Sequence, residues 1–143
     1  MNSDTVKLLG ECNAGIKMGV SSIDEVMPSV KSEKLKQMLY DSKQEHEKLG
    51  NETHTLLNQL KDRTKEPNPV AKGMAWIKTN VMLTMNESDS TVADLITDGC
   101  NMGVKSLNKY LNEYKTAEAN VKDLTRRLIK EEDSLAVKMR QFL

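Results

Sequence analysis

Apolar residues recur at intervals of three and four along most of this chain, and that spacing constrains its fold more than any other feature. Such spacing places the apolar side chains on one face of an α-helix. Helix formers such as Lys, Leu, Glu and Met dominate, and aromatic residues make up only 3% of the chain. Strands are therefore disfavoured. The pattern predicts an all-α protein with four long helices, at residues Asp4–Met27, from Ser32 to about residue 62, from about Thr91 to Tyr114, and through Val121 to Phe142.

Prolines and capping residues separate the predicted helices. Pro28 ends or bends the first helix, and Ser32 is a suitable N-cap for the second. Arg63–Pro69 contains two prolines and is the strongest helix-breaking segment in the chain. Asn86–Ser90 supplies capping side chains for the third long helix. A short break at Lys115–Ala117 is the least marked of these boundaries, because no residue there forbids a continuous helix.

An internal repeat relates the two halves of the chain. Residues 12–17 (Cys-Asn-Ala-Gly-Ile-Lys) match residues 100–105 (Cys-Asn-Met-Gly-Val-Lys) at four of six positions. Each copy lies on a long amphipathic helix that is followed by a second helix of similar length, which favours a duplicated helical hairpin. We therefore expect one domain over residues 1–143, with hairpin 1 at about 4–62, a crossover with a short helix at about 63–89, and hairpin 2 at about 90–143.

Two pairs of glycines lie in the middle of the repeated helices: Gly15 with Gly19, and Gly99 with Gly103. A glycine inside a helix costs up to about 1 kcal/mol relative to alanine. Such glycines usually mark a close approach between helices. Their spacing predicts tight packing of the two repeated helices rather than ligand contact.

Charge and composition limit the partners of the chain. Lys plus Arg and Asp plus Glu both number 21, so no excess charge attracts nucleic acid or an anionic membrane surface. No apolar run has the length of a signal peptide or of a membrane span. The two cysteines are too few for a disulfide framework and would remain thiols in a reducing compartment. These features predict a cytoplasmic protein without nucleic-acid or membrane partners.

The expected crossover helix, Val70–Met85, has two apolar strips. Its main strip can pack against the bundle, whereas Trp76 and Leu83 form a second apolar strip on a different face of the helix. A monomer would leave this second strip exposed to water. Trp76 and Leu83 are therefore the predicted interface of a homodimer.

Three features of the sequence are similar to those of a known group of helical proteins. They are Leu8–Cys12 at the start of the first helix, Ser42–Leu49 in the second, and a long crossover before the second hairpin. In these features the chain resembles the small, largely uncharacterised bacterial four-helix proteins of the ferritin-like superfamily. The resemblance implies a ferritin-like four-helix bundle whose long crossover joins the second and third long helices.

The chain departs from the di-iron pattern of that superfamily. That pattern has a Glu on helices one and three and Glu-x-x-His on helices two and four. His46 lies where the helix-two histidine would be, but Lys43 precedes it by three residues, and 129–132 contains no histidine. Glu11 and Asp98, the acidic candidates, fall roughly 140° to 170° from the centres of their apolar faces. Ferroxidase or oxygenase chemistry is therefore not expected.

One side chain with polar chemistry interrupts the apolar stripe of each long helix: Cys12, His46, Cys100 and Glu132. Two thiolates, an imidazole and a carboxylate form a set that suits a metal ion, zinc before iron. The set lacks the short Cys-x-x-Cys spacing of specific zinc motifs. The favoured alternative is a buried His46–Glu132 hydrogen-bonded pair, with the cysteines packed as small apolar residues and with Ser42 and Thr53 bonded to the imidazole.

Two hypotheses for function follow. The first is a non-enzymatic helical interaction or scaffold protein that forms a homodimer and binds no cofactor. The second is a metal-binding ferritin-like protein with a degenerate or non-di-iron site, built on the four side chains above or on the shoulder carboxylates Glu45 and Glu131. His54 follows Glu52 on a helix shoulder, where it is expected to be a solvated surface residue. No catalytic signature favours an enzyme.

Overall fold

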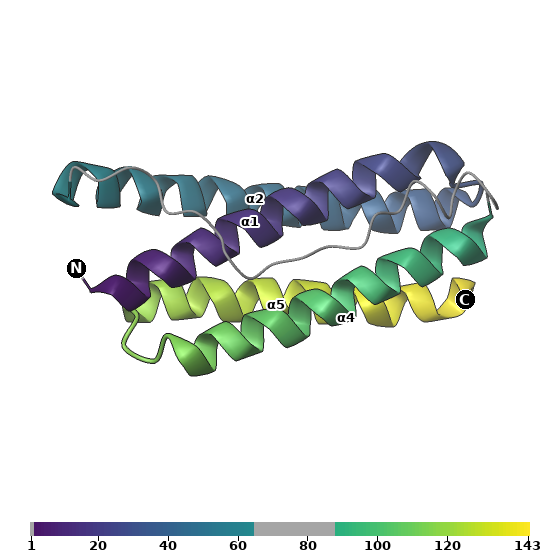
Figure 1. Cartoon of the computed structure of the whole chain (residues 1–143). Coiled ribbons are helices and arrows are strands. Elements are labelled where there is room, and N and C mark those ends of the chain that lie inside the picture. Colours follow the sequence, from purple (N-terminus) through teal and green to yellow (C-terminus); the bar gives the residue numbers. More distant parts are fainter. Residues whose placement is uncertain (1, 65–87) are drawn as a thin grey trace.

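The computed structural model describes residues 2–64 and 88–143, and within them the chain is helical (Figure 1). The long helices confirm the predicted all-α class for this part of the chain. In residues 2–64 and 88–143, no helix combines the length and apolar character needed to cross a bilayer. The elements are α1 (Ser3–Val26), the 3₁₀ helix η1 (Met27–Ser29), α2 (Glu33–Thr64), α4 (Asp89–Glu113), α5 (Ala119–Met139) and the 3₁₀ helix η2 (Arg140–Phe142).

Capping side chains lie at the helix starts that the sequence predicts for α2 and α4. The Ser32 hydroxyl accepts a hydrogen bond from the backbone N–H of Leu35 at 3.2 Å, in front of α2. The Ser88 hydroxyl accepts one from the N–H of Thr91 at 3.1 Å, in front of α4. Each bond satisfies a backbone donor that has no partner within its own helix. The predicted break after the third long helix is confirmed, because α4 ends at Glu113 and α5 begins only at Ala119.

Hydrogen bonds at the two ends of the bundle fix the helix directions. The backbone N–H groups of Lys31 and Ser32 donate to the Asp89 carboxylate at 2.7 and 3.1 Å, so α2 and α4 start side by side. At the other end, the N–H of Glu118 donates to the Thr5 hydroxyl at 2.9 Å, so α1 and α5 start together. The end of α2 and the start of α4 consequently lie at opposite ends of the bundle (Figure 1).

The predicted crossover helix, Val70–Met85, lies outside the described residues. The two residues assigned to a dimer interface, Trp76 and Leu83, belong to the same part of the chain. Their role remains a prediction from the sequence.

The core consists of two apolar clusters with a polar layer between them. One cluster includes Leu49 and Leu128, and the other includes Leu39 and Leu135. His46 falls between the two leucines of α2, and Glu132 falls between the two leucines of α5. Both are fully covered, with 1% and 3% of their surface exposed. The polar layer therefore lies where the two apolar clusters meet.

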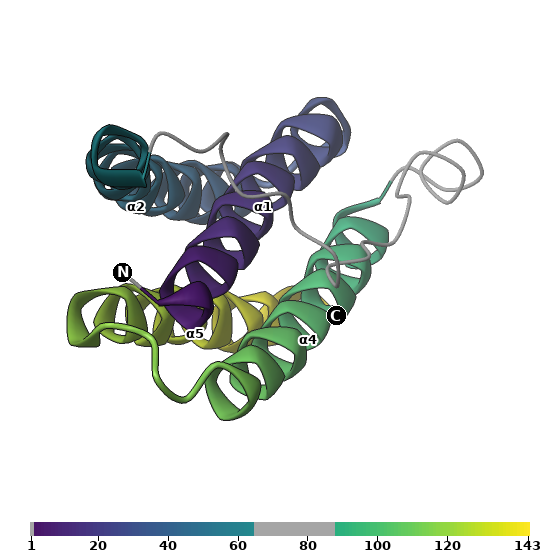
Figure 2. The ribbon, with the colours of Figure 1, turned by 60° about the vertical axis from the view of Figure 1, so that its left-hand side comes forward.

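Helix α1 is buried around more of its circumference than its apolar stripe predicts. It packs against α2, α4 and α5, and Figure 2 shows it between α2 and α4. Glu11 is consequently 3% exposed, so the prediction that it points away from the core is wrong. A helical wheel based on one apolar stripe assumes that the helix has one buried face. Helix α1 instead has three partner helices, which cover most of its circumference. Asp98 is exposed, as predicted.

Candidate functional site

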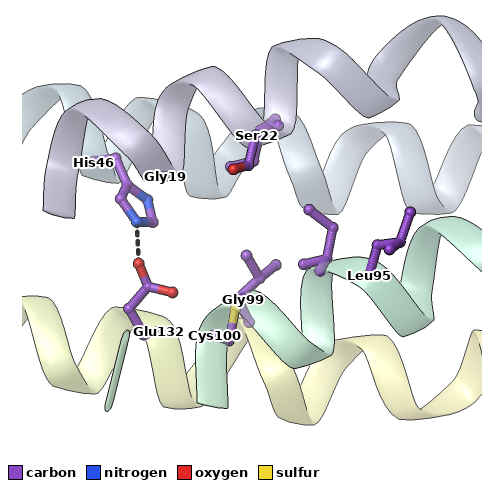
Figure 3. A pocket seen from close by; sticks show the side chains of 10 residues that line it. Gly19, Ser22, His46, Leu95, Gly99, Cys100 and Glu132 are labelled. Atoms are coloured by element: carbon purple, nitrogen blue, oxygen red, sulfur yellow. Dashed lines mark hydrogen bonds and ion pairs between the residues drawn. The ribbon is translucent and has the colours of Figure 1, made fainter. Parts of the chain in front are cut away.

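A direct hydrogen bond joins the two hairpins at the centre of the bundle. His46 Nε2 of α2 lies 2.8 Å from Glu132 Oε1 of α5 (Figure 3). The other ring nitrogen, Nδ1, lies 2.8 Å from the backbone carbonyl oxygen of Ser42. A carbonyl can only accept, so Nδ1 carries a proton. The predicted His46–Glu132 pair is present, and both imidazole nitrogens are engaged.

Two opposing influences act on the imidazole. Burial disfavours the charged ring and would lower its pKa. The hydrogen bond and charge of Glu132, followed by the Ser42 carbonyl, outweigh burial and raise the pKa of His46 above its ordinary value. The pair shares one proton between imidazole and carboxyl, and either placement leaves it neutral as a whole.

A second carboxylate is connected to the pair through Ser42. The Ser42 hydroxyl donates to Glu131 Oε2 at 2.8 Å and also lies 3.4 Å from His46 Nδ1. Glu131 is half-buried, and this burial is the main reason that its pKa is raised. Thr53, predicted to bond the imidazole, instead donates to the Leu49 carbonyl at 2.7 Å. That prediction is wrong, because a buried threonine can satisfy its hydroxyl within its own helix.

Gly19 of α1 leaves the space that the imidazole occupies. A Cβ atom at this position would lie 2.7 Å from His46 Cδ2, 2.8 Å from Nε2 and 3.5 Å from Glu132 Oε1. The first two distances are shorter than real Cβ contacts, so the imidazole packs directly against the α1 backbone. The sequence predicts that this glycine marks tight packing between the two repeated helices, α1 and α4. For Gly19 that prediction is wrong, because the groups that a Cβ atom would meet are the imidazole of His46 from α2 and the carboxylate of Glu132 from α5.

The two cysteines occupy different surroundings. Cys100 belongs to the apolar cluster of Leu39 and Leu135 and hydrogen-bonds to the Glu132 carboxylate. Burial, followed by the charge of Glu132, raises the pKa of Cys100. Cys12 belongs to the other cluster, where its Sγ lies 3.0 Å from the Thr125 hydroxyl. Burial raises the pKa of Cys12 to about 12 despite that hydrogen bond. Both thiols are therefore protonated at neutral pH.

The four predicted metal ligands do not converge on one point. His46 and Glu132 are bonded to each other, Cys100 lies beside Glu132, and Cys12 is in the other half of the core. Among residues 2–64 and 88–143, no three or more His, Cys, Asp and Glu side chains are arranged to hold a metal ion. Of the alternative shoulder carboxylates, Glu131 bonds to Ser42, whereas Glu45 is exposed.

A further buried polar contact that the sequence did not predict lies between α1 and α4. Tyr110 of α4 hydrogen-bonds to the Glu11 carboxylate. Burial, followed by the charge of Glu11, raises the pKa of Tyr110 to about 12. The sequence signal at Glu11 is its place in the repeat. Glu11 immediately precedes Cys12, as Gly99 immediately precedes Cys100. His54 is exposed, in agreement with its predicted surface role.

Comparison with known proteins yields no relative. No family model, no curated protein and no solved structure matches this chain. The ferritin-like resemblance therefore rests on the sequence features described above.

Proposed function

We propose that this chain is a non-enzymatic helical interaction or scaffold protein with a ferritin-like plan, acting as a homodimer in the cytoplasm. The observation that supports this proposal best is the His46–Glu132 pair, in which the central polar groups are bonded to one another. Both ring nitrogens have partners at 2.8 Å, so neither offers a free lone pair to a substrate. The polar interior serves to join two hairpins.

The cysteines support the same proposal. A cysteine acts as a nucleophile or metal ligand through its thiolate. Burial raises the pKa of both Cys12 and Cys100, which keeps them as thiols. They fill the core as small apolar side chains do.

The proposed dimer interface is the second apolar strip of the crossover, with Trp76 and Leu83 at its centre. This assignment rests on the sequence pattern, because these residues lie outside the described part of the chain. A large aromatic side chain beside an aliphatic one is typical of an interface core.

Sedimentation velocity at micromolar to tens of micromolar concentration tests the dimer. The wild type should sediment as a dimer, and the double variant Trp76→Ala/Leu83→Ala should sediment as a monomer with unchanged helical circular dichroism. Tyr40→Ala removes another large side chain, one that is 52% exposed on α2, and should remain dimeric. A monomeric wild type at every concentration would refute the dimer. A monomeric Tyr40→Ala beside a dimeric double variant would refute the assigned interface.

Metal content separates this proposal from the metal-binding alternative. Protein purified without a histidine tag should carry only substoichiometric zinc and iron, and added Zn²⁺ should leave its thermal unfolding unchanged. One equivalent of metal per chain, lost in the Cys100→Ala variant, would overturn the non-metal proposal.

A further inference from the structure

A surface groove between α2 and α5 contains a carboxylate that is connected to the buried pair. The groove offers about 530 Å³ of space to solvent, and Glu131 and Ser134 of α5 line it together with Glu45 of α2. Glu131 is half-buried, and its Oε2 accepts a hydrogen bond from the buried Ser42 hydroxyl at 2.8 Å. This one carboxylate therefore meets both the solvent and the core.

The hydrogen bonds between the imidazole and Glu131 all point in one direction. A serine hydroxyl has one hydrogen, and Ser42 donates it to Glu131. The hydroxyl oxygen therefore turns only lone pairs toward His46 Nδ1, which lies 3.4 Å away and carries its own proton. The Ser42 hydroxyl dipole consequently has its positive end at Glu131 and its negative end at the ring, an orientation that favours a positively charged imidazole.

The charges that face the imidazole come from α2 and α5. Glu132 lies on the Nε2 side of the ring, and the negative charge of Glu131 also raises the pKa of His46. Among the described residues, α1 and α4 present uncharged groups here, Gly19 and the Cys100 thiol. Glu131 itself is influenced by Glu45 of α2 and Lys138 of α5. The other charged side chains of the groove are exposed: Lys48, Glu52, Arg127 and Lys130.

We propose that Ser42 and Glu131 form a pH-sensitive relay, in which protonation of Glu131 in the groove moves the shared proton of the buried pair from His46 to Glu132. While Glu131 is ionised, the imidazole has two negative partners and holds the proton as an imidazolium. A proton from solvent neutralises Glu131 and removes one of these partners. The Nε2–H bond then breaks and an Oε1–H bond forms along the 2.8 Å hydrogen bond, so the pair remains neutral as a whole.

The relay goes beyond the proposed scaffold role, because it couples the solvent to the bond that joins the two hairpins. Burial favours the uncharged form of Glu131, so this side chain takes up its proton in milder acid than an exposed glutamate does.

NMR of the imidazole nitrogens in the full chain tests the relay, because the Nε2 shift reports whether that nitrogen carries the proton. Near neutral pH, Nε2 of the wild type should have the shift of a protonated nitrogen, and Glu131→Gln should move it toward that of an unprotonated one. The proton affinity of the imidazole should fall about tenfold in Glu131→Gln. Glu45→Gln removes an exposed carboxylate of the same groove, one that is paired with Lys48, and should change this affinity less than about twofold.

Ser42→Ala removes the hydroxyl that links the two groups. In that background Glu131→Gln should change the proton affinity of the imidazole less than about threefold, because only the charge acting through space remains. An equal effect of Glu131→Gln with and without Ser42→Ala would overturn the relay. An Nε2 shift that Glu131→Gln leaves unchanged would do the same.

A titration of the wild type replaces the variant if Glu131→Gln loses its helical circular dichroism. As pH falls and the carboxyl carbon signal of Glu131 reports its protonation, the Nε2 signal of His46 should move toward the unprotonated shift. An ordinary histidine moves in the opposite direction, because it gains a proton in acid. An Nε2 signal that does not follow the Glu131 carboxyl signal would refute the coupling.

Discussion

Gly19→Ala tests whether the imidazole is held against the α1 backbone. In the interior of a helix this change normally stabilises the protein by about 1 kcal/mol. Here the new methyl group would lie 2.7 Å from His46 Cδ2. The ring cannot move cheaply, because both of its nitrogens are hydrogen-bonded at 2.8 Å within the core. Displacing it breaks a buried pair, which costs about 3–5 kcal/mol, so the net loss should be about 2–4 kcal/mol.

Urea unfolding of two glycine variants measures this loss. At Gly50, a Cβ atom would lie 3.3 Å from Ile16 Cγ2, a contact that a shift of a few tenths of an ångström relieves. Gly50→Ala should therefore stay within about 1 kcal/mol of the wild type. Gly19→Ala should lower the unfolding midpoint at an unchanged urea dependence. In a His46→Ala background the clash is absent, so Gly19→Ala should no longer destabilise. An equal cost of Gly19→Ala in both backgrounds would refute the reasoning.

Three further predictions concern charge and reactivity. The raised pKa of His46 means that the folded state holds a proton that the unfolded state has lost above about pH 6.5. The free energy of unfolding of the wild type should therefore fall as pH rises from about 6.5 through the folded-state pKa. Urea titrations at several pH values should show this pH dependence in the wild type and its loss in His46→Gln. Cys12 and Cys100 should react with a thiol reagent at least about a hundredfold more slowly in the folded protein than in urea, and equal rates would contradict their burial. Glu52→Ala removes the ion pair between Glu52 and Arg127, and both of these side chains are more than 40% exposed. The free energy of unfolding should therefore fall by less than about 1 kcal/mol in the same urea assay.

The helices could be predicted because their signals are local. The three-and-four spacing defines each helix, and capping at Ser32 and Ser88 depends on residues only three positions away. The central pair could also be predicted. A single polar residue inside an apolar stripe requires a buried partner. His46 and Glu132 each precede a core leucine by three residues, Leu49 and Leu135.

Other contacts depend on how the helices are rotated against one another, which no local pattern records. Cys12 and Cys100 look alike within the repeat, yet one contacts Thr125 and the other Glu132. Glu11 lies off the apolar stripe but is covered because α1 has three partner helices. Such contacts follow from tertiary packing and could not be read from periodicity.

The position of the His46–Glu132 pair explains why a polar layer is useful at the junction of two similar hairpins. Buried ion pairs are often no more stabilising than apolar residues of the same volume, so stability alone does not account for the pair. The apolar stripes of α2 and α5 would tolerate a slip of about one helical turn, because leucines such as Leu49, Leu128 and Leu135 flank the pair. A slip would set His46 and Glu132 against leucines and leave each polar group buried without its partner. That arrangement costs about 3–5 kcal/mol, so the pair disfavours the slipped registers that the apolar stripes alone would allow.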